Sequence, residues 1–217
     1  MGAILQSLDR PIVYSLCQYG MEDVWKWGPD AGGNSWRTTG DIADNWESME
    51  QIGFNQEPLG EWARPGHWND PDMLEVGNGG MTNTEYRTHM SLWVLLASPL
   101  LAGNDLRDMS PETLEILTTP EVIAINQDPL GRQARRVAQD GELEVWAKPL
   151  EDGRVAAGLF NRGEEAAPVT ARWADLELAG KVAVRDAWAK KDLGSFADEF
   201  TAEVEPHGVV LVVLKGS

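Results

Sequence analysis

The chain has 217 residues, 42% of them hydrophobic, which suits one large or two smaller folded domains and excludes a disordered chain. Its net charge of −17, with no basic cluster, excludes nucleic acid and an anionic membrane surface as expected partners. The single cysteine, Cys17, excludes an intrachain disulfide and a zinc site of several thiolates, and no apolar run is long enough to span a membrane.

The first part of the chain alternates short apolar runs with helical patterns. Asp44, followed three residues later by Glu47, predicts a capped helix over 43–49, and Ser110 caps a second helix over 110–118. Residues 83–97 carry Tyr86, Met90, Trp93 and Ala97 at three- and four-residue steps, which predicts a helix with one buried face. Further helices are expected at 1–10 and 120–127, and strands at 11–17, 67–77 and 98–104.

This alternation indicates parallel strands joined by crossover helices. Polar residues gather where the strands end, which is where a (β/α)8 barrel builds its active site. A complete barrel needs about 250 residues, so the strand–helix units here predict half a barrel.

Residues beyond Gln133 change to a period of two, broken by turn sequences such as QDG and EDG. Six strands are expected, at 142–150, 154–162, 169–176, 181–188, 200–206 and 208–215. They predict an antiparallel sheet domain of sandwich or barrel type.

Two carboxylates are the candidates for chemistry. Gly40 lets the chain turn tightly before Asp41, and Arg37, four residues earlier, offers a cationic fork; a structural ion pair is the alternative. In the stretch WNDPDML, Asp70 is expected to form an Asx turn and Asp72 to contact a ligand. Paired carboxylates near the many tryptophans would suit sugar hydrolysis. The three histidines have no ligand spacing and no phosphate-type glycine loop is present, so neither a metal nor a cofactor is expected.

Five ordered motifs carry a family resemblance: IVYSLCQYG, WRTTGDI, FNQEPLGEWARPGHWNDPDMLEVGN, SPLLAGNDL and VIAINQDPLG. They resemble the second half of glycoside hydrolase family 27, the family of the α-galactosidases and α-N-acetylgalactosaminidases. The resemblance implies that residues 1–130 form the C-terminal half of a (β/α)8 barrel and that residues 131–217 form an antiparallel β-sandwich domain.

The resemblance also implies roles for residues. The reaction would be retaining hydrolysis of terminal α-D-galactosyl residues, with Asp41 as acid/base and Arg37 contacting the sugar. The pair Asp72 and Met73 would line the sugar pocket. The segment from Cys17 to Gly20 would lie near the sugar 2-position, where the bulky Tyr19 replaces a tryptophan common in the family and fits galactose better than its N-acetyl derivative.

The family's nucleophile motif, Y-x-K-x-D-x-C, has no counterpart in this sequence. We therefore expect that Asp72 is not the partner of Asp41, and that the chain alone hydrolyses substrate very slowly. Met1 is then expected to be an internal methionine of a longer protein. The expected partners are an α-galactoside and either a missing N-terminal half or a second copy of the chain.

Two alternatives stay open from the sequence. One is a non-catalytic carbohydrate-binding fragment, and the other is a sister specificity such as α-N-acetylgalactosaminidase or β-L-arabinopyranosidase. Localisation stays unknown, because no signal peptide is recognisable in MGAILQSLDR.

Overall fold

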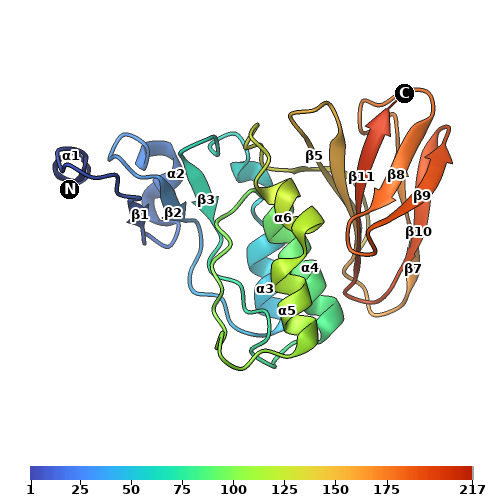
Figure 1. The fold of residues 1–217 in the computed structure, drawn as a ribbon, viewed down its shortest axis with the longest axis horizontal. Helices are drawn as coiled ribbons and strands as arrows, with labels where there is room; N and C mark the ends of the chain where they lie inside the picture. Colours follow the sequence, from blue (N-terminus) through green and yellow to red (C-terminus); the bar gives the residue numbers. More distant parts are fainter. Residues whose placement is uncertain (217) are drawn as a thin grey trace.

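The computed structural model describes residues 1–216 and has three layers (Figure 1). Three short parallel strands lie toward the N-terminal side, long helices fill the middle, and antiparallel sheets form the C-terminal side. The first part contains the helices α1 (Gly2–Gln6), α2 (Val24–Trp27), α3 (Trp46–Phe54), α4 (Asn83–Leu95), α5 (Pro111–Thr118) and α6 (Pro120–Asn126), the 3-10 turns η1 (Met21–Asp23) and η2 (Glu57–Leu59), and the strands β1 (Ser15–Leu16), β2 (Ser35–Arg37) and β3 (Trp68–Asp70).

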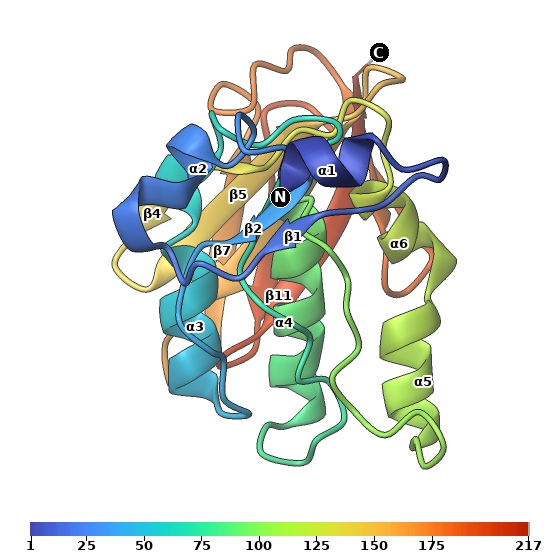
Figure 2. The same ribbon diagram turned by 90° about the vertical axis from the view of Figure 1, so that its left-hand side faces the viewer.

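The strands β1, β2 and β3 pair in parallel in that order, with helices in the connections, as in part of a (β/α)8 barrel. Figure 2 shows this sheet in front of α3 and α4. Three predicted strands differ from the prediction, and of residues 67–77 only β3 (Trp68–Asp70) forms a strand. Of residues 11–17 only two pair, and Val13 is 81% exposed rather than buried. Residues 98–104 form no strand and touch the sheet through one parallel bridge, Leu74 to Ala102.

The predicted helices form, and their caps explain where they begin. Ser110 accepts the Thr113 N–H at the start of α5, as predicted. Thr82 and Glu85 form a capping box at the start of α4, which was not predicted. The cap of α3 differs from the prediction. Asn45, not Asp44, accepts the Ser48 N–H, because the carboxylate of Asp44 is occupied by the Tyr86 hydroxyl and the Gly80 N–H.

The C-terminal part is a sandwich of two antiparallel sheets. The six-stranded sheet has the order β4-β5-β6-β11-β8-β9, and β10 pairs with β7 in the second sheet. The strands are β4 (Arg135–Asp140), β5 (Leu143–Pro149), β6 (Val155–Asn161), β7 (Ala167–Arg172), β8 (Val182–Asp186), β9 (Lys191–Phe196), β10 (Glu199–Val204) and β11 (Val209–Gly216). The six predicted strands are present, and the sequence analysis missed β4 and β9.

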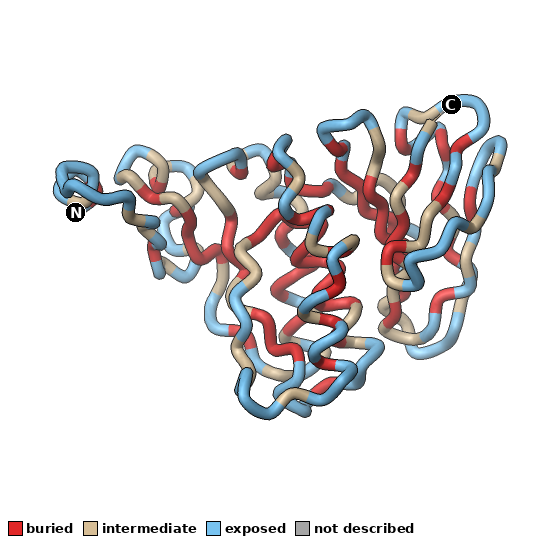
Figure 3. Tube along the Cα trace, in the orientation of Figure 1, coloured by how far each residue is buried: buried red, intermediate tan, exposed pale blue. Residues whose placement is uncertain are grey.

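One core joins the helices to the larger sheet. Trp93 of α4 and Phe54 of α3 belong to the same buried cluster as Trp146 of β5 and Phe160 of β6. A second cluster, which includes Val145 of β5, fills the space between the two sheets. The buried segments therefore run from the central helices into the sandwich (Figure 3). Within residues 1–216, no helix has the length and apolar character needed to cross a membrane.

Candidate active site

The carboxyl ends of β2 and β3 lie at the same edge of the sheet, because the strands are parallel and Arg37 is the register partner of Asp70. The Arg37 side chain is only 10% exposed. Its Nη2 atom lies 2.8 Å from Asp72 Oδ2 and 3.1 Å from Asp41 Oδ1, and it donates to the Gly40 carbonyl at 2.8 Å. One guanidinium group thus fixes the loop that follows β2 and the loop that follows β3.

The two carboxylates on this guanidinium group differ in environment. The Asp41 side chain is 75% exposed, and Arg37 is its one side-chain partner within residues 1–216. The Asp72 side chain is 14% exposed, and its oxygens also accept the N–H groups of Ile42 and Met73. Asp72 adopts a left-handed backbone with φ of 91°, a conformation that costs a non-glycine residue free energy. Asp72 therefore supports the loop that carries Asp41, whereas Asp41 is open to solvent.

The residues before Asp72 are structural. Asp70 accepts the Asp72 N–H at 3.0 Å, which is the Asx turn predicted from the sequence. Burial raises the pKa of the Asp70 carboxyl above its usual range. Asn69 accepts from the Trp36 indole and donates to Gln133, so it links the strands to the segment that enters the sandwich.

Of the other predicted residues, Tyr19 contacts Arg37. The Tyr19 ring lies under the Arg37 guanidinium group, 5.4 Å from its centroid, and is 45% exposed. A hydrogen bond with Cys17 is the main cause that raises the pKa of the Tyr19 phenol. Tyr19 has a left-handed backbone like Asp72. Met73 follows Asp72 and packs against the main core, so its contact with a sugar stays a prediction.

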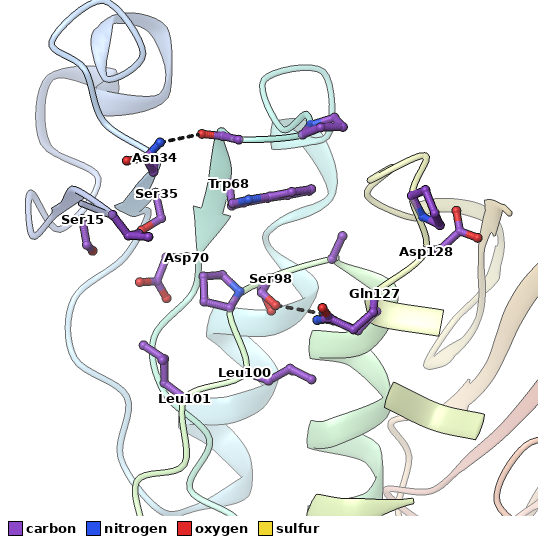
Figure 4. A pocket seen from close by; sticks show the side chains of 17 residues that line it. Ser15, Asn34, Ser35, Trp68, Asp70, Ser98, Leu100, Leu101, Gln127 and Asp128 are labelled. Carbon is purple, nitrogen blue, oxygen red and sulfur yellow. Dashed lines mark hydrogen bonds between the residues drawn. The ribbon is translucent and has the colours of Figure 1, made fainter. Parts of the chain in front are cut away.

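A separate cavity of about 600 Å³ lies on the inner side of the parallel strands (Figure 4). Trp68 and Asp70 form one wall, and the partly buried Leu100 and the exposed Leu101 form another. None of the predicted site residues lines it. Sequence reasoning missed this cavity. Ser15, Ser35 and Trp68 are register partners in the three strands, so their side chains lie on the same face of the sheet.

No group of three or more His, Cys, Asp and Glu side chains in the described part of the chain is arranged to hold a metal ion. Arg37 instead pairs with Asp41 and Asp72 and lies over the Tyr19 ring, and the Asp41 carboxylate of this cluster is exposed. Such a carboxylate can exchange a proton with a bound molecule at the mouth of the partial barrel.

The partial (β/α)8 barrel followed by a β-sandwich fits part of a longer class of glycoside hydrolases, and family comparison agrees. The family model described as alpha galactosidase A matches residues 1–128, and the one described as the alpha galactosidase C-terminal beta sandwich domain matches residues 140–214. The chain belongs to this alpha-galactosidase family, glycoside hydrolase family 27.

The similar proteins are longer than this chain. Alpha-galactosidase 2 of Arabidopsis thaliana is 50% identical over 216 residues, which cover 99% of this chain and 54% of that protein. The crystal structure of alpha-galactosidase I from Mortierella vinacea superposes with a TM-score of 0.96 at 36% identity, covering 100% of this chain and 62% of that one. A family 27 β-L-arabinopyranosidase from Geobacillus stearothermophilus gives a TM-score of 0.91 at 32% identity, over 100% of this chain and 52% of that one. The chain thus spans about half the length of the curated relatives it matches.

Proposed function

We propose that this chain supplies the acid/base residue, Asp41, for retaining hydrolysis of terminal α-D-galactosyl residues. The observation that carries the proposal is the exposed Asp41 carboxylate held by Arg37 at the carboxyl end of β2. The relatives named alpha-galactosidases support the choice of substrate.

The proposed chemistry has two steps. First, the Asp41 carboxylic acid gives its proton to the glycosidic oxygen while a carboxylate nucleophile forms an ester bond to the galactosyl carbon, and the aglycone leaves as an alcohol. The Asp41 carboxylate then takes a proton from water, and the resulting hydroxyl breaks the ester to release galactose. Arg37 keeps the Asp41 carboxyl in place through both steps. The sequence contains no counterpart of the family's nucleophile motif, so we assign the nucleophile to a second polypeptide segment.

The cavity on the inner side of the strands supports such a second segment. Strand β1 pairs on one side only within the described residues, and Val13 and Leu101 beside the cavity are 81% and 55% exposed. A further strand–helix segment would pair with this free edge and bury these side chains. A missing N-terminal half fits this description better than a second copy, because a second copy would not bring the nucleophile motif.

A related specificity is the second candidate. The similarity to the β-L-arabinopyranosidase structure supports it, since β-L-arabinopyranose differs from α-D-galactose by lacking the exocyclic hydroxymethyl group. The bulky Tyr19 beside Arg37 favours either of these sugars over an N-acetylated one.

The test is release of p-nitrophenol from p-nitrophenyl α-galactoside. The chain is assayed alone, then with a separately produced first half of a family 27 barrel carrying the Y-x-K-x-D strand, and each assay is repeated with Asp41→Asn. We expect no turnover by the chain alone, turnover with the added half, and loss of that turnover with Asp41→Asn. Turnover by the chain alone would contradict the assignment of the nucleophile, and unchanged turnover with Asp41→Asn would contradict that of the acid/base. Parallel assays with the β-L-arabinopyranoside and the α-N-acetylgalactosaminide identify the sugar.

A further inference from the structure

One face of α4 holds the loop between β3 and α4 along its length. Tyr86, His89 and Trp93 follow each other at three- and four-residue steps on this face, and all three are buried. The Trp93 indole donates to the Asp72 carbonyl at 2.7 Å, and the His89 ring accepts the Glu75 N–H at 3.1 Å. Burial lowers the pKa of His89 to about 3, so its ring stays neutral at ordinary pH and can accept. Both hydrogen bonds fix the loop that follows β3.

Tyr86 differs from these two neighbours, because its hydroxyl joins the loop after β3 to the loop after β2. It accepts the Gly79 N–H at 2.6 Å in the first loop, and it donates to Asp44 Oδ1 at 2.9 Å in the second. Burial raises the pKa of the Tyr86 phenol, so the hydroxyl keeps the proton that it donates. Tyr86 is only 3% exposed, and its hydrogen bonds are therefore shielded from water.

The same two loops meet directly at Gly80. Its N–H donates to Asp44 Oδ2, and a Cβ atom on Gly80 would lie 1.9 Å from the Asp44 carbonyl oxygen. Only glycine allows two backbones to approach so closely. The Asp44 carboxylate thus accepts from both Gly80 and Tyr86, and it is the point at which the loop after β2 is attached to α4.

Asp44 is three residues after Asp41, so this attachment acts on the loop that carries the proposed acid/base. Arg37 holds the Asp41 carboxylate at 3.1 Å, and Asp72 accepts the Ile42 N–H at 2.9 Å. Those two contacts come from the ends of the strands, whereas the contact with Asp44 comes from a helix. Because the Asp41 side chain is exposed, its position depends on the backbone of this loop more than on packing.

We propose that Tyr86 is a positioning residue for Asp41. Its hydroxyl, acting through Asp44, keeps the loop after β2 in the conformation from which Asp41 transfers its proton. This inference rests on the proposed function and adds a buried residue of α4 to it. A tyrosine that only filled the core could be replaced by phenylalanine without effect, so Tyr86→Phe distinguishes the two roles.

The first test measures hydrogen exchange of single backbone amides by two-dimensional NMR of the chain alone. In Tyr86→Phe we expect the Ile42 N–H to exchange at least about tenfold faster, the effect of losing one buried hydrogen bond. The Thr38 N–H, which is bonded to β3 at the start of the loop, should be unchanged. Tyr14→Phe is the matched control, because the Tyr14 hydroxyl makes no hydrogen bond within residues 1–216.

A double-variant cycle checks that the effect passes through Asp44. Asp44→Ala alone should accelerate exchange of the Ile42 N–H by at least about tenfold as well. Adding Tyr86→Phe to Asp44→Ala should then change the exchange rate by less than about twofold, because the contact is already lost. Circular dichroism of each variant excludes unfolding as the cause of faster exchange.

The second test uses the chain together with the added first half of a family 27 barrel. It compares kcat/KM for methyl α-galactoside, whose leaving alcohol needs a proton, with that for 2,4-dinitrophenyl α-galactoside, whose leaving phenolate does not. In Tyr86→Phe we expect kcat/KM to fall at least about tenfold for the methyl substrate and less than about twofold for the dinitrophenyl substrate. A merely structural role of Tyr86 would lower both values together.

The outcomes separate this inference from the proposed function. Unchanged exchange at Ile42, additive effects of Tyr86→Phe and Asp44→Ala, or equal losses with the two substrates would each overturn the inference. The absence of turnover by the unchanged chain with the added half would instead contradict the proposed function. The exchange measurements would then still decide whether Tyr86 holds the loop.

Discussion

Lys148 places a charge in the interface between β5 and α6, and its removal gives a pH-dependent prediction. The residue is 1% exposed, and its Nζ atom donates to the Ile125 carbonyl at 3.0 Å. Desolvation lowers the pKa of Lys148 from 10.5 to about 8, against the opposing effect of the Asp128 carboxylate. Between these two pKa values the unfolded chain binds a proton that the folded chain has released. The free energy of unfolding therefore rises with pH across this window.

The magnitude follows from the shift. At about 1.4 kcal/mol per pKa unit, the lowered pKa of Lys148 raises the free energy of unfolding by about 3 kcal/mol across this pH window. Replacing Lys148 with Met, which has a similar length and no charge, removes this contribution. From neutral pH to about pH 10.5, we expect the free energy of unfolding of the unchanged chain to rise by about 3 kcal/mol relative to that of Lys148→Met.

Urea unfolding followed by tryptophan fluorescence, at constant ionic strength across this pH range, measures the difference. Lys191→Met is the control, because Lys191 is exposed on the edge strand β9 and its loss should leave the pH profile nearly unchanged. Parallel stability curves for the unchanged chain and Lys148→Met would refute the reasoning.

Two further substitutions test local structure through the midpoint of thermal unfolding. Asn45→Ala removes the side chain that accepts the Ser48 N–H and should cost about 1 kcal/mol, whereas Asn45→Asp keeps the cap; equal losses in both would show that the cap is unimportant. Gly53→Ala places a Cβ atom 2.5 Å from Leu92 Cδ2 and should lower the free energy of unfolding by about 1–3 kcal/mol. Gly216→Ala is the control, because a Cβ atom there meets no other atom and should have no packing cost. A neutral Gly53→Ala variant would mean that the contact between α3 and α4 relaxes freely.

The sequence predicts the interior strands of the six-stranded sheet and misses the two edge strands of that sheet for one physical reason. Strands β4 and β9 form the two edges of the six-stranded sheet. In β9 none of the six residues is buried. The strand therefore has no buried face, and its sequence shows no alternation with a period of two. Interior strand β5 has the opposite property, since Trp146 packs toward the helices and Val145 toward the second sheet. Burial on both faces is also why Lys148 lies in an interface, which alternation alone does not predict.

The wrong cap on α3 has a different cause. The prediction of Asp44 rested on the three-residue spacing to Glu47, and Asn is about as favourable as Asp at the N-cap position. Asp44 is taken by Tyr86 and Gly80, which are more than thirty residues away in the chain. Such a non-local contact is invisible to a pattern read within one turn of helix. The apolar composition of residues 11–17 and of residues 98–104 likewise does not decide how many of them pair. The length of each paired stretch depends on the neighbouring strand.

For the site, the sequence predicts which residues gather but not how they differ. Arg37, Asp41 and Asp72 look alike as polar residues at strand ends, and the structure places both carboxylates on one guanidinium nitrogen. The Asp72 side chain also accepts two backbone N–H groups, and its own backbone is left-handed, so moving this side chain would release the loop that carries Asp41. Asp41 has no such bonds to lose, because Arg37 alone holds its exposed carboxylate within the described residues. A bound molecule can therefore approach the exposed Asp41 carboxylate without breaking a hydrogen bond to the backbone, whereas the Asp72 carboxylate holds two such bonds. That difference is the structural support for our proposal that Asp41 transfers the proton and that Asp72 supports its loop.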